Sequence, residues 1–165
     1  MAKDAIQILK ERAEVAAHVE EQVAMATVAL SLFVRGGQTY GLRLSDVEGA
    51  GRLRQLSHVP GAPPWMVGAA QHRGAIISLL DLAPFWGLEL KGLADLPTFV
   101  VVSDGAQRIG LLVEELLGVH EVDAAIQPYR GDERAGVSEV ARMGMDAVLV
   151  LSAARLMQDP RLKAG

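Results

Sequence analysis

Short runs of β-branched and aliphatic residues, separated by Gly, Pro and Asp, dominate the chain from Met25 onward. Runs of this length and composition are typical of β-strands, because helices need longer segments with a 3.6-residue period. The strongest short hairpin signal is Asp104-Gly105, and Gly36-Gly37 is a second good turn. The pattern predicts extended segments at residues 27–35, 39–44, 47–56, 75–82, 98–103, 107–114, 119–124, 137–143 and 147–151.

A few segments depart from this strand pattern. Residues 4–22 contain no Gly or Pro and carry a narrow apolar stripe, which predicts a helix capped by Asp4. Short helices are predicted near residues 84–88 and from Ser152 to Met157, the second one stopped by Pro160. The remaining breaks read as loops at residues 60–64 and 128–136, a bulge or bend near Gly49 and Gly51, and a connector at residues 91–97.

The chain also contains a weak internal repeat. Gln38-Thr-Tyr-Gly-Leu matches Gln107-Arg-Ile-Gly-Leu, and Arg73-Gly74 before one apolar strand corresponds to Met143-Gly144 before another. The repeat predicts two similar β modules in tandem. Closing each small sheet into a barrel removes most unpaired strand edges, and two barrels side by side leave a groove between them. We therefore expect a mainly β fold of two small barrels that share a core.

Composition narrows the function classes. The 165 residues are 50% hydrophobic, so the apolar surface suffices for a packed interior. The net charge of −4, with both signs interspersed, argues against nucleic acid as the main partner. The absence of cysteine rules out disulfides and thiolate chemistry and is compatible with a reducing cytosol. We find no signal peptide, and the apolar run at residues 23–34 is too short for direct membrane insertion.

No constellation of residues indicates catalysis, a metal or a cofactor. The four histidines are scattered, and no nucleophile-elbow or phosphate-cradling motif occurs. Glu114 and Glu115 would point to opposite faces of a strand and could not act as an acid/base pair. Arg73 precedes an apolar strand, where it either lies at the rim of the inter-barrel groove or makes a structural hydrogen bond across it.

Several motifs, taken in order, resemble the CheW domain of bacterial chemotaxis. The resemblance covers residues 25–162 and leaves residues 1–24 as an N-terminal helical extension, with the connector near residues 91–97 between the two halves. The motifs are Tyr40-Gly-Leu-x-Leu-x-x-Val47, Pro60-Gly-Ala-Pro-Pro-Trp-Met-Val-Gly68, Arg73-Gly-x-Ile-Ile-x-Leu-Leu-Asp-Leu82, Ile109-Gly-Leu-Leu-Val-Glu-Glu-Leu-Leu-Gly-Val119 and Val148-Leu-Val-Leu-x-x-x-Arg-Leu156.

The resemblance implies two tandem SH3-like five-stranded β-barrels and no catalysis. Proteins of this type are cytoplasmic scaffolds that link the tips of chemoreceptors to the histidine kinase CheA and can cluster at receptor arrays. The receptor helix lies in the groove between the barrels, and the kinase regulatory domain docks barrel to barrel. Carried over by position, the receptor-binding residues are Gln71, His72 and Arg73, and the kinase-binding residues are Val47, Glu48 and Gly49.

The chain departs from the family pattern at several positions. Gly49-Ala50-Gly51 replaces an acidic residue and branched apolars, Gln71-His72 replaces Asn-Leu, Ser78 replaces a proline and Ser152 an aspartate. Because truncated side chains on a docking face remove contacts, the first change makes kinase coupling less secure than receptor binding. An accessory protein that binds receptors but not the kinase is therefore the alternative. A small ligand-binding barrel or enzyme is a third reading, and it requires a deep polar pocket.

Overall fold

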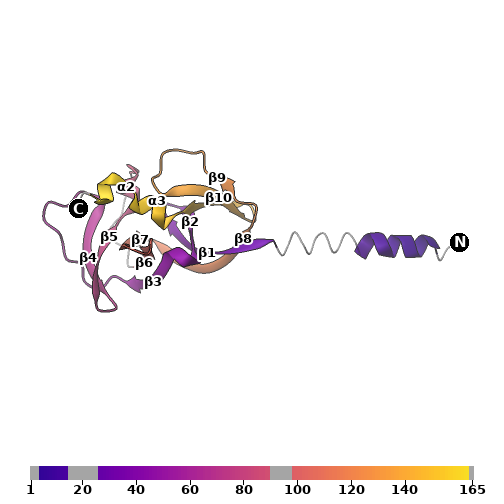
Figure 1. The fold of residues 1–165 in the computed structure, drawn as a ribbon, viewed down its shortest axis with the longest axis horizontal. Coiled ribbons are helices and arrows are strands. Elements are labelled where there is room, and N and C mark those ends of the chain that lie inside the picture. Colours follow the sequence, from indigo (N-terminus) through magenta and orange to yellow (C-terminus); the bar gives the residue numbers. More distant parts are fainter. Residues whose placement is uncertain (1–3, 15–25, 90–97, 164–165) are drawn as a thin grey trace.

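The computed structural model describes residues 4–14, 26–89 and 98–163, which form an N-terminal helix over residues 4–14 and a body of β-strands and short helices (Figure 1). The connector predicted at residues 91–97 and the rest of the predicted N-terminal helix lie outside the described residues. In chain order the elements of the body are β1 (Thr27–Arg35), β2 (Gln38–Arg43), the 3₁₀ turn η1 (Leu44–Asp46), β3 (Val47–Arg52), β4 (Met66–His72), β5 (Ala75–Leu80), α2 (Leu82–Phe85), β6 (Thr98–Ser103), β7 (Arg108–Val113), β8 (Glu115–Asp123), β9 (Gln127–Pro128), β10 (Val137–Met143), β11 (Asp146–Leu151), α3 (Ala153–Met157) and α4 (Pro160–Lys163).

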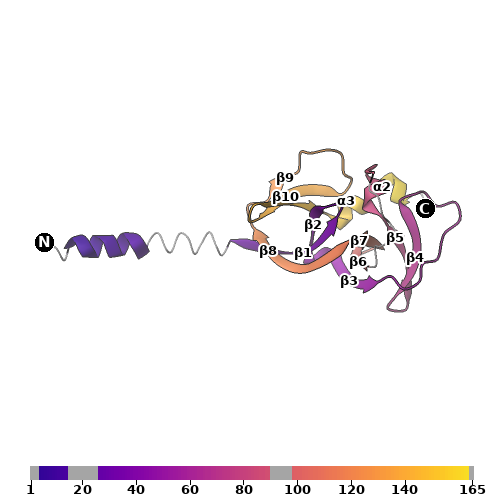
Figure 2. The ribbon, with the colours of Figure 1, turned by 180° about the vertical axis from the view of Figure 1, so that it is seen from behind.

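The strands form two sheets that exchange hairpins between the two halves of the chain. The first sheet has the order β8-β1-β2-β11-β10-β9, and β10 also packs against β8. The second has the order β3-β6-β7-β5-β4. The first hairpin of each repeat thus completes the barrel of the other repeat, through the parallel pairs β2–β11 and β7–β5. Figure 2 shows β8 and β4 at opposite ends of the body.

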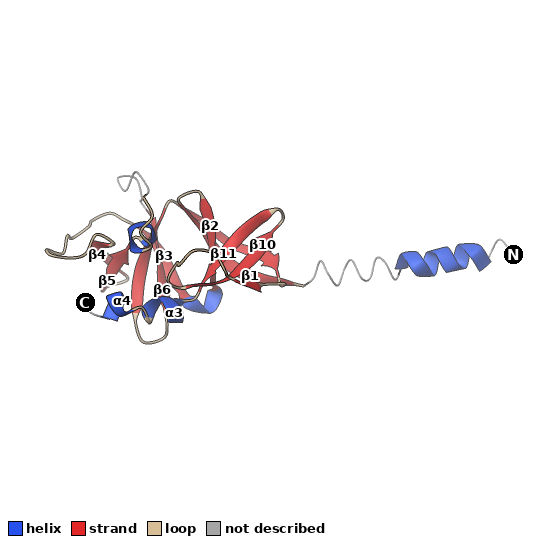
Figure 3. Ribbon diagram, turned by 90° about the horizontal axis from the view of Figure 1, so that it is seen from above, coloured by secondary structure: helices blue, strands red, loops and turns tan. Residues whose placement is uncertain are grey.

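Side chains that alternate between the two faces of the strands form three hydrophobic cores from these two sheets. Successive side chains on a strand point to opposite faces. In β6, Phe99 and Val101 fill the interior of the second barrel, whereas Val100 and Val102 enter a core that both barrels share. In β11, residues 148 and 150 likewise fill the first barrel, and residues 149 and 151 enter the shared core. Figure 3 shows the strands making up most of the body, with the short helices around them.

The repeated glycines, Gly41 and Gly110, have a steric reason for their place in the sequence. Each lies on a strand that pairs in parallel with the other half of the chain, opposite Val150 and Leu79 respectively. A Cβ at Gly110 would lie 2.5 Å from Leu79 Cδ2, and one at Gly41 only 3.0 Å from Leu30 Cδ1. Close-packed interiors do not absorb such overlap without strain. The repeat noticed in the sequence therefore marks two equivalent points of close approach inside the barrels.

A buried ionic cluster joins the two sheets. Arg35, at the end of β1, donates from Nε and Nη2 to the two carboxylate oxygens of Asp81 at 3.0 and 3.1 Å, and from Nη1 to Glu114 at 2.9 Å. Asp81 is fully buried after β5 and also accepts a hydrogen bond from the backbone N–H of Ala83, so it caps α2. Burial alone would lower the pKa of the Arg35 guanidinium, but the hydrogen bond and charge of Asp81 raise it above its ordinary value.

The structure confirms most predicted strands and corrects several boundaries. The bulge predicted near Gly49 is present, as a register shift between Val47 and Gly49. No strand was predicted at β4, whose small residues lack a β-branched pattern and which is held by pairing with β5. The segment from Val47 leaves the sheet at Arg52, and β8 begins at Glu115, earlier than expected. Pro160 does not simply stop a helix, because it opens α4 at a position where no N–H is required.

The structure also shifts one predicted helix and contains no helix, among the described residues, that could span a membrane. The predicted turn at residues 84–88 is displaced, since the cap by Asp81 starts α2 at Leu82. Among the described residues, no helix has the length and apolar character needed to cross a membrane.

Candidate partner-binding patch

The β4–β5 hairpin carries Arg73 at its tip in a strained backbone conformation. Arg73 has φ 48° and Gly74 has φ 80°, so both central residues of the turn are left-handed, as in a type I′ turn. Such turns prefer Asn, Asp or Gly at the first central position, because a larger L-residue costs roughly 1–2 kcal/mol there. Arg73 is the only described residue other than glycine with a positive φ. Its presence is therefore not explained by the stability of the hairpin.

The side chain of Arg73 is free to meet a partner. Arg73 is exposed, and it makes no hydrogen bond or ion pair with any residue that the structure describes. A guanidinium offers five donors in a rigid fork, which suits carboxylates and backbone carbonyls. Of the two roles left open by the sequence, a structural hydrogen bond across a groove is not seen among the described residues.

His72 closes the second barrel next to Arg73. Its ring lies edge-on to Phe99, with the ring centroids 5.7 Å apart. Opposite it on β3, a Cβ at Gly49 would lie 3.2 Å from His72 Nε2, and a Cβ at Gly51 would lie 2.6 Å from Phe99 Cζ. The two glycines thus make room for His72 and Phe99. The sequence-based idea that Gly49 and Gly51 truncate an outer docking face overlooked this packing.

The six residues assigned by family resemblance fall on neighbouring parts of the second barrel. Gln71 and His72 end β4, Arg73 follows in the turn, and Gly49 of β3 approaches both His72 and Arg73. Glu48 is exposed and pairs with Arg108 at 3.3 Å, whereas Val47 is partly buried against the shared core. We call the set of residues 47–49 and 71–73 the seam patch. The structure therefore brings Gly49 next to His72 and Arg73, whereas Val47 contacts the shared core and Glu48 contacts Arg108.

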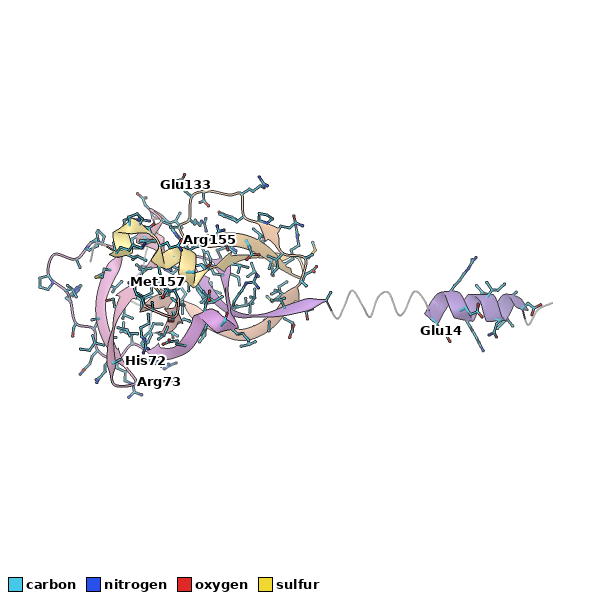
Figure 4. All side chains as sticks on the ribbon, in the orientation of Figure 1. Glu14, His72, Arg73, Glu133, Arg155 and Met157 are labelled. Carbon is cyan, nitrogen blue, oxygen red and sulfur yellow. The ribbon has the colours of Figure 1, made fainter. Side chains whose placement is uncertain are left out.

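A large cleft lies elsewhere, between α2, the loop after β9 and the C-terminal helices. It has a volume of about 880 Å³ and is lined by residues 84–87, 129, 131–137, 155, 158, 159 and 161. Figure 4 shows Arg155 and Glu133 at this cleft, far from His72 and Arg73. No residue of the seam patch lines this cleft or either of the two smaller ones.

Four of the six charged side chains that line this cleft form two ion pairs, Asp132 with Arg134 and Asp159 with Arg161. Arg134 donates to Asp132 at 2.9 Å and to the hydroxyl of Tyr40 at 2.6 Å. Hydrogen bonds from Tyr129 and then Arg134 lower the pKa of Asp132, and burial raises the pKa of Tyr40. In the second pair, Arg161 donates to Asp159, which lowers the pKa of the Asp159 carboxyl. These contacts tie the loop after β9 to the rest of the fold. They do not bring an acid, a base and a nucleophile together around one reacting atom.

Sequence reasoning missed the buried contact between Arg35 and Asp81 and the hydrogen bond of Trp86. Arg35 was read only as the end of a strand, and Trp86 was not singled out, although its indole N–H donates to the carbonyl of Ala135 at 2.9 Å. Two signals were available: an arginine at the end of an apolar strand, and an aspartate directly after another. Among the described residues, no group of three or more His, Cys, Asp or Glu side chains could hold a metal ion.

The fold and the seam patch define a protein of two intertwined β-barrels that presents an arginine-tipped hairpin. Its sequence matches the CheW-like domain family over residues 30–161, and the chain belongs to that family. It is 27% identical over 109 residues to the protein PilI of Pseudomonas aeruginosa, a match that covers 59% of this chain and 61% of PilI. The chain thus spans less than two thirds of the length of this relative.

Two further proteins resemble the chain. The chemotaxis protein CheW of Bacillus subtilis is 20% identical over 116 residues, which cover 67% of this chain and 74% of that protein. The crystal structure of the scaffolding protein TtCheW from Thermoanaerobacter tengcongensis superposes with a TM-score of 0.72 at 22% identity, covering 82% of this chain and 95% of TtCheW. The superposition confirms the predicted architecture of two SH3-like barrels.

Proposed function

We propose that this chain is a non-enzymatic scaffold that binds the cytoplasmic tip of a chemoreceptor and links it to a CheA-type histidine kinase. The observation that carries the proposal is the strained, exposed Arg73 at the tip of the β4–β5 hairpin, beside Gly49 and His72. Strain of this kind persists where function maintains it. Membership of the CheW-like family and the resemblance to a scaffolding protein support the same proposal.

Both ligands of the scaffold would meet the second barrel at or near the seam patch. We propose that the receptor helix contacts Gln71, His72 and Arg73, and that the kinase regulatory domain contacts the β3 side through Val47, Glu48 and Gly49. The short distance between Gly49 and the β4 residues means that the two ligands would be neighbours on the scaffold. Neighbouring sites allow one small protein to bring a receptor and a kinase into contact.

Val47→Asp is expected to weaken binding of the kinase regulatory domain by about 30-fold or more, the size of a lost hot-spot contact. A carboxylate on this apolar position must be desolvated in the complex without a partner. The measurement is a calorimetric titration of the full chain with the kinase regulatory domain.

Two further variants control this titration. Val47→Thr keeps the shape of the side chain and reports on packing, because Val47 also contacts the shared core. Val119→Asp introduces the same charge on β8, in the first sheet, where Val119 is 61% exposed. Unchanged kinase binding by a folded Val47→Asp variant would show that Val47 is not part of the kinase contact. Absence of kinase binding by the wild-type chain would eliminate the linking role and leave the accessory protein, which binds receptors alone.

A further inference from the structure

The N-terminal helix over residues 4–14 has an apolar face that no described part of the chain covers. All eleven of its residues are exposed, and Ile6, Ile8 and Leu9 are each more than half exposed. Ile6, Leu9 and Ala13 are spaced by three and four residues, which places them on one face of the helix. Short helices are marginal in water, because most helical stability comes from packing of the apolar face. The helix therefore needs a surface to pack against.

A groove with apolar walls lies on the second barrel, between β5, β7 and the C-terminal helices. Its volume of about 440 Å³ is within the range of protein binding pockets. Leu80 and Met157 in its lining are almost fully buried, whereas Trp65, Ile109 and Leu162 are only partly buried. We call this hollow the β5 groove. Its lining leaves apolar surface uncovered beside the shared core.

The apolar surface continues beyond the β5 groove along the outer face of β5. Ser78 lines the groove, and Ile76, two residues earlier, points to the same face of the strand. Ile76 is 81% exposed, the highest fraction for a large hydrophobic side chain in any described strand. From Ile76 to Leu80 the strand runs about 13 Å, at roughly 3.3 Å per residue. The helix face from Ile6 to Ala13 is about 10 Å long, so the two surfaces are comparable in length.

The net charges of the groove lining and of the helix have opposite signs. Arg108 and Lys163 are the two charged residues that line the groove, and both are cations. Arg108 pairs with Glu48, but both side chains are at least 40% exposed, and surface pairs of this kind contribute little. The helix carries three acidic and two basic side chains over residues 4–14, a net charge of −1. An amphipathic helix of this composition is therefore complementary to the groove in polarity and in sign.

We propose that the N-terminal helix of one copy of the chain docks in the β5 groove of a second copy, with Ile6 and Leu9 as its anchors. Figures 1 and 2 show the helix beyond the β1 and β8 end of the body, whereas β4 and the C-terminus lie at the opposite end. A helix held away from its own groove can reach the groove of another molecule. The contact would join scaffolds to one another without a receptor or a kinase, so the inference goes beyond the proposed function and does not rest on it.

Engineered cysteines test which residues meet, because the chain contains no cysteine of its own. Leu9→Cys and Ser78→Cys variants of the full chain, one of them carrying an affinity tag, are mixed under mild oxidation. The disulfide between the two variants is expected to form at least about fivefold faster than in two control pairs, because docking raises the effective concentration of the thiols. The controls are Gln7→Cys with Ser78→Cys and Leu9→Cys with Met145→Cys. Gln7 lies on the opposite face of the helix, and Met145 is 95% exposed on the β10–β11 hairpin. Equal rates in all three pairs would overturn the inference.

Light scattering of the full chain over a range of concentrations provides the second measurement. The wild type is expected to shift from monomer towards dimer as the concentration rises. Leu9→Asp is expected to stay monomeric where Gln7→Asp, which adds the same charge on the other helix face, still associates. A wild type that is monomeric throughout, or equal association of the two variants, contradicts the proposal.

The double variant Leu9→Cys, Ser78→Cys separates docking on a second copy from docking on the same molecule. The inference requires disulfides between chains, formed at a rate that rises with concentration. A disulfide within one chain, formed at a rate independent of concentration, would show that the helix packs on its own body and would overturn the inference.

Discussion

Asp81→Ala is expected to lower the free energy of unfolding by about 3–5 kcal/mol, a large part of the roughly 5–15 kcal/mol that stabilises a domain. The change leaves Arg35, which is 3% exposed, with only Glu114 as a charged partner and removes the cap of α2. An uncompensated buried charge is among the most destabilising defects a fold can contain. Urea denaturation followed by circular dichroism provides the measurement.

Two controls separate burial from charge in this experiment. Glu139→Ala breaks an ion pair with Arg43 whose side chains are 33% and 45% exposed, and it is expected to cost less than about 1 kcal/mol. The double variant Arg35→Met, Asp81→Leu removes both charges and is expected to recover much of the loss, since apolar replacements of buried ion pairs are often neutral. A loss below about 1 kcal/mol for Asp81→Ala would show that the cluster does not hold the two sheets together.

Arg73→Asn is expected to stabilise the protein and to weaken receptor binding at the same time. Asn is favoured before Gly in a type I′ turn, so relief of the left-handed strain is expected to add about 1 kcal/mol to the free energy of unfolding. Loss of the guanidinium is expected to weaken binding to a receptor-tip fragment by about 30-fold, as for a central contact residue. Thermal unfolding and calorimetric titration of the same sample measure both effects.

A gain in stability together with a loss of receptor binding distinguishes a contact residue from a structural one. Arg142, an exposed arginine on β10 near the equivalent hairpin of the second repeat, supplies the control. Arg142→Ala should change neither quantity by a comparable amount. If Arg73→Asn lowers stability and binding together, Arg73 supports the fold and is not the residue that meets the receptor.

Much of the fold could be predicted because local signals agreed with the final packing. The Asp104-Gly105 turn, the apolar runs and the cap at Ser152 are local features, and each element formed where the sequence indicated. β4 escaped prediction because its residues are small, and its strand conformation depends on pairing with β5. The exchange of hairpins between the two halves was also invisible locally, since it depends on parallel pairing between distant strands.

The candidate site residues could be predicted only from the resemblance to the CheW family, and their geometry could not be predicted from the sequence. Sequence position indicated Arg73, but the left-handed turn that singles it out is a property of the folded backbone. Gly49 and Gly51 were read as missing contacts, whereas the structure shows that they accommodate His72 and Phe99. A single sequence does not reveal that two positions 23 or more residues apart complement one another in size.

The central claim is that one small scaffold holds a receptor helix and a kinase domain on neighbouring surfaces. The most direct measurement is size-exclusion chromatography with light scattering on a mixture of receptor-tip fragment and kinase regulatory domain, with and without the full chain. The account predicts a complex whose mass accounts for all three components, and no comparable complex when the chain is left out. Displacement of the kinase domain by the receptor fragment, so that only two-component complexes elute, would contradict it.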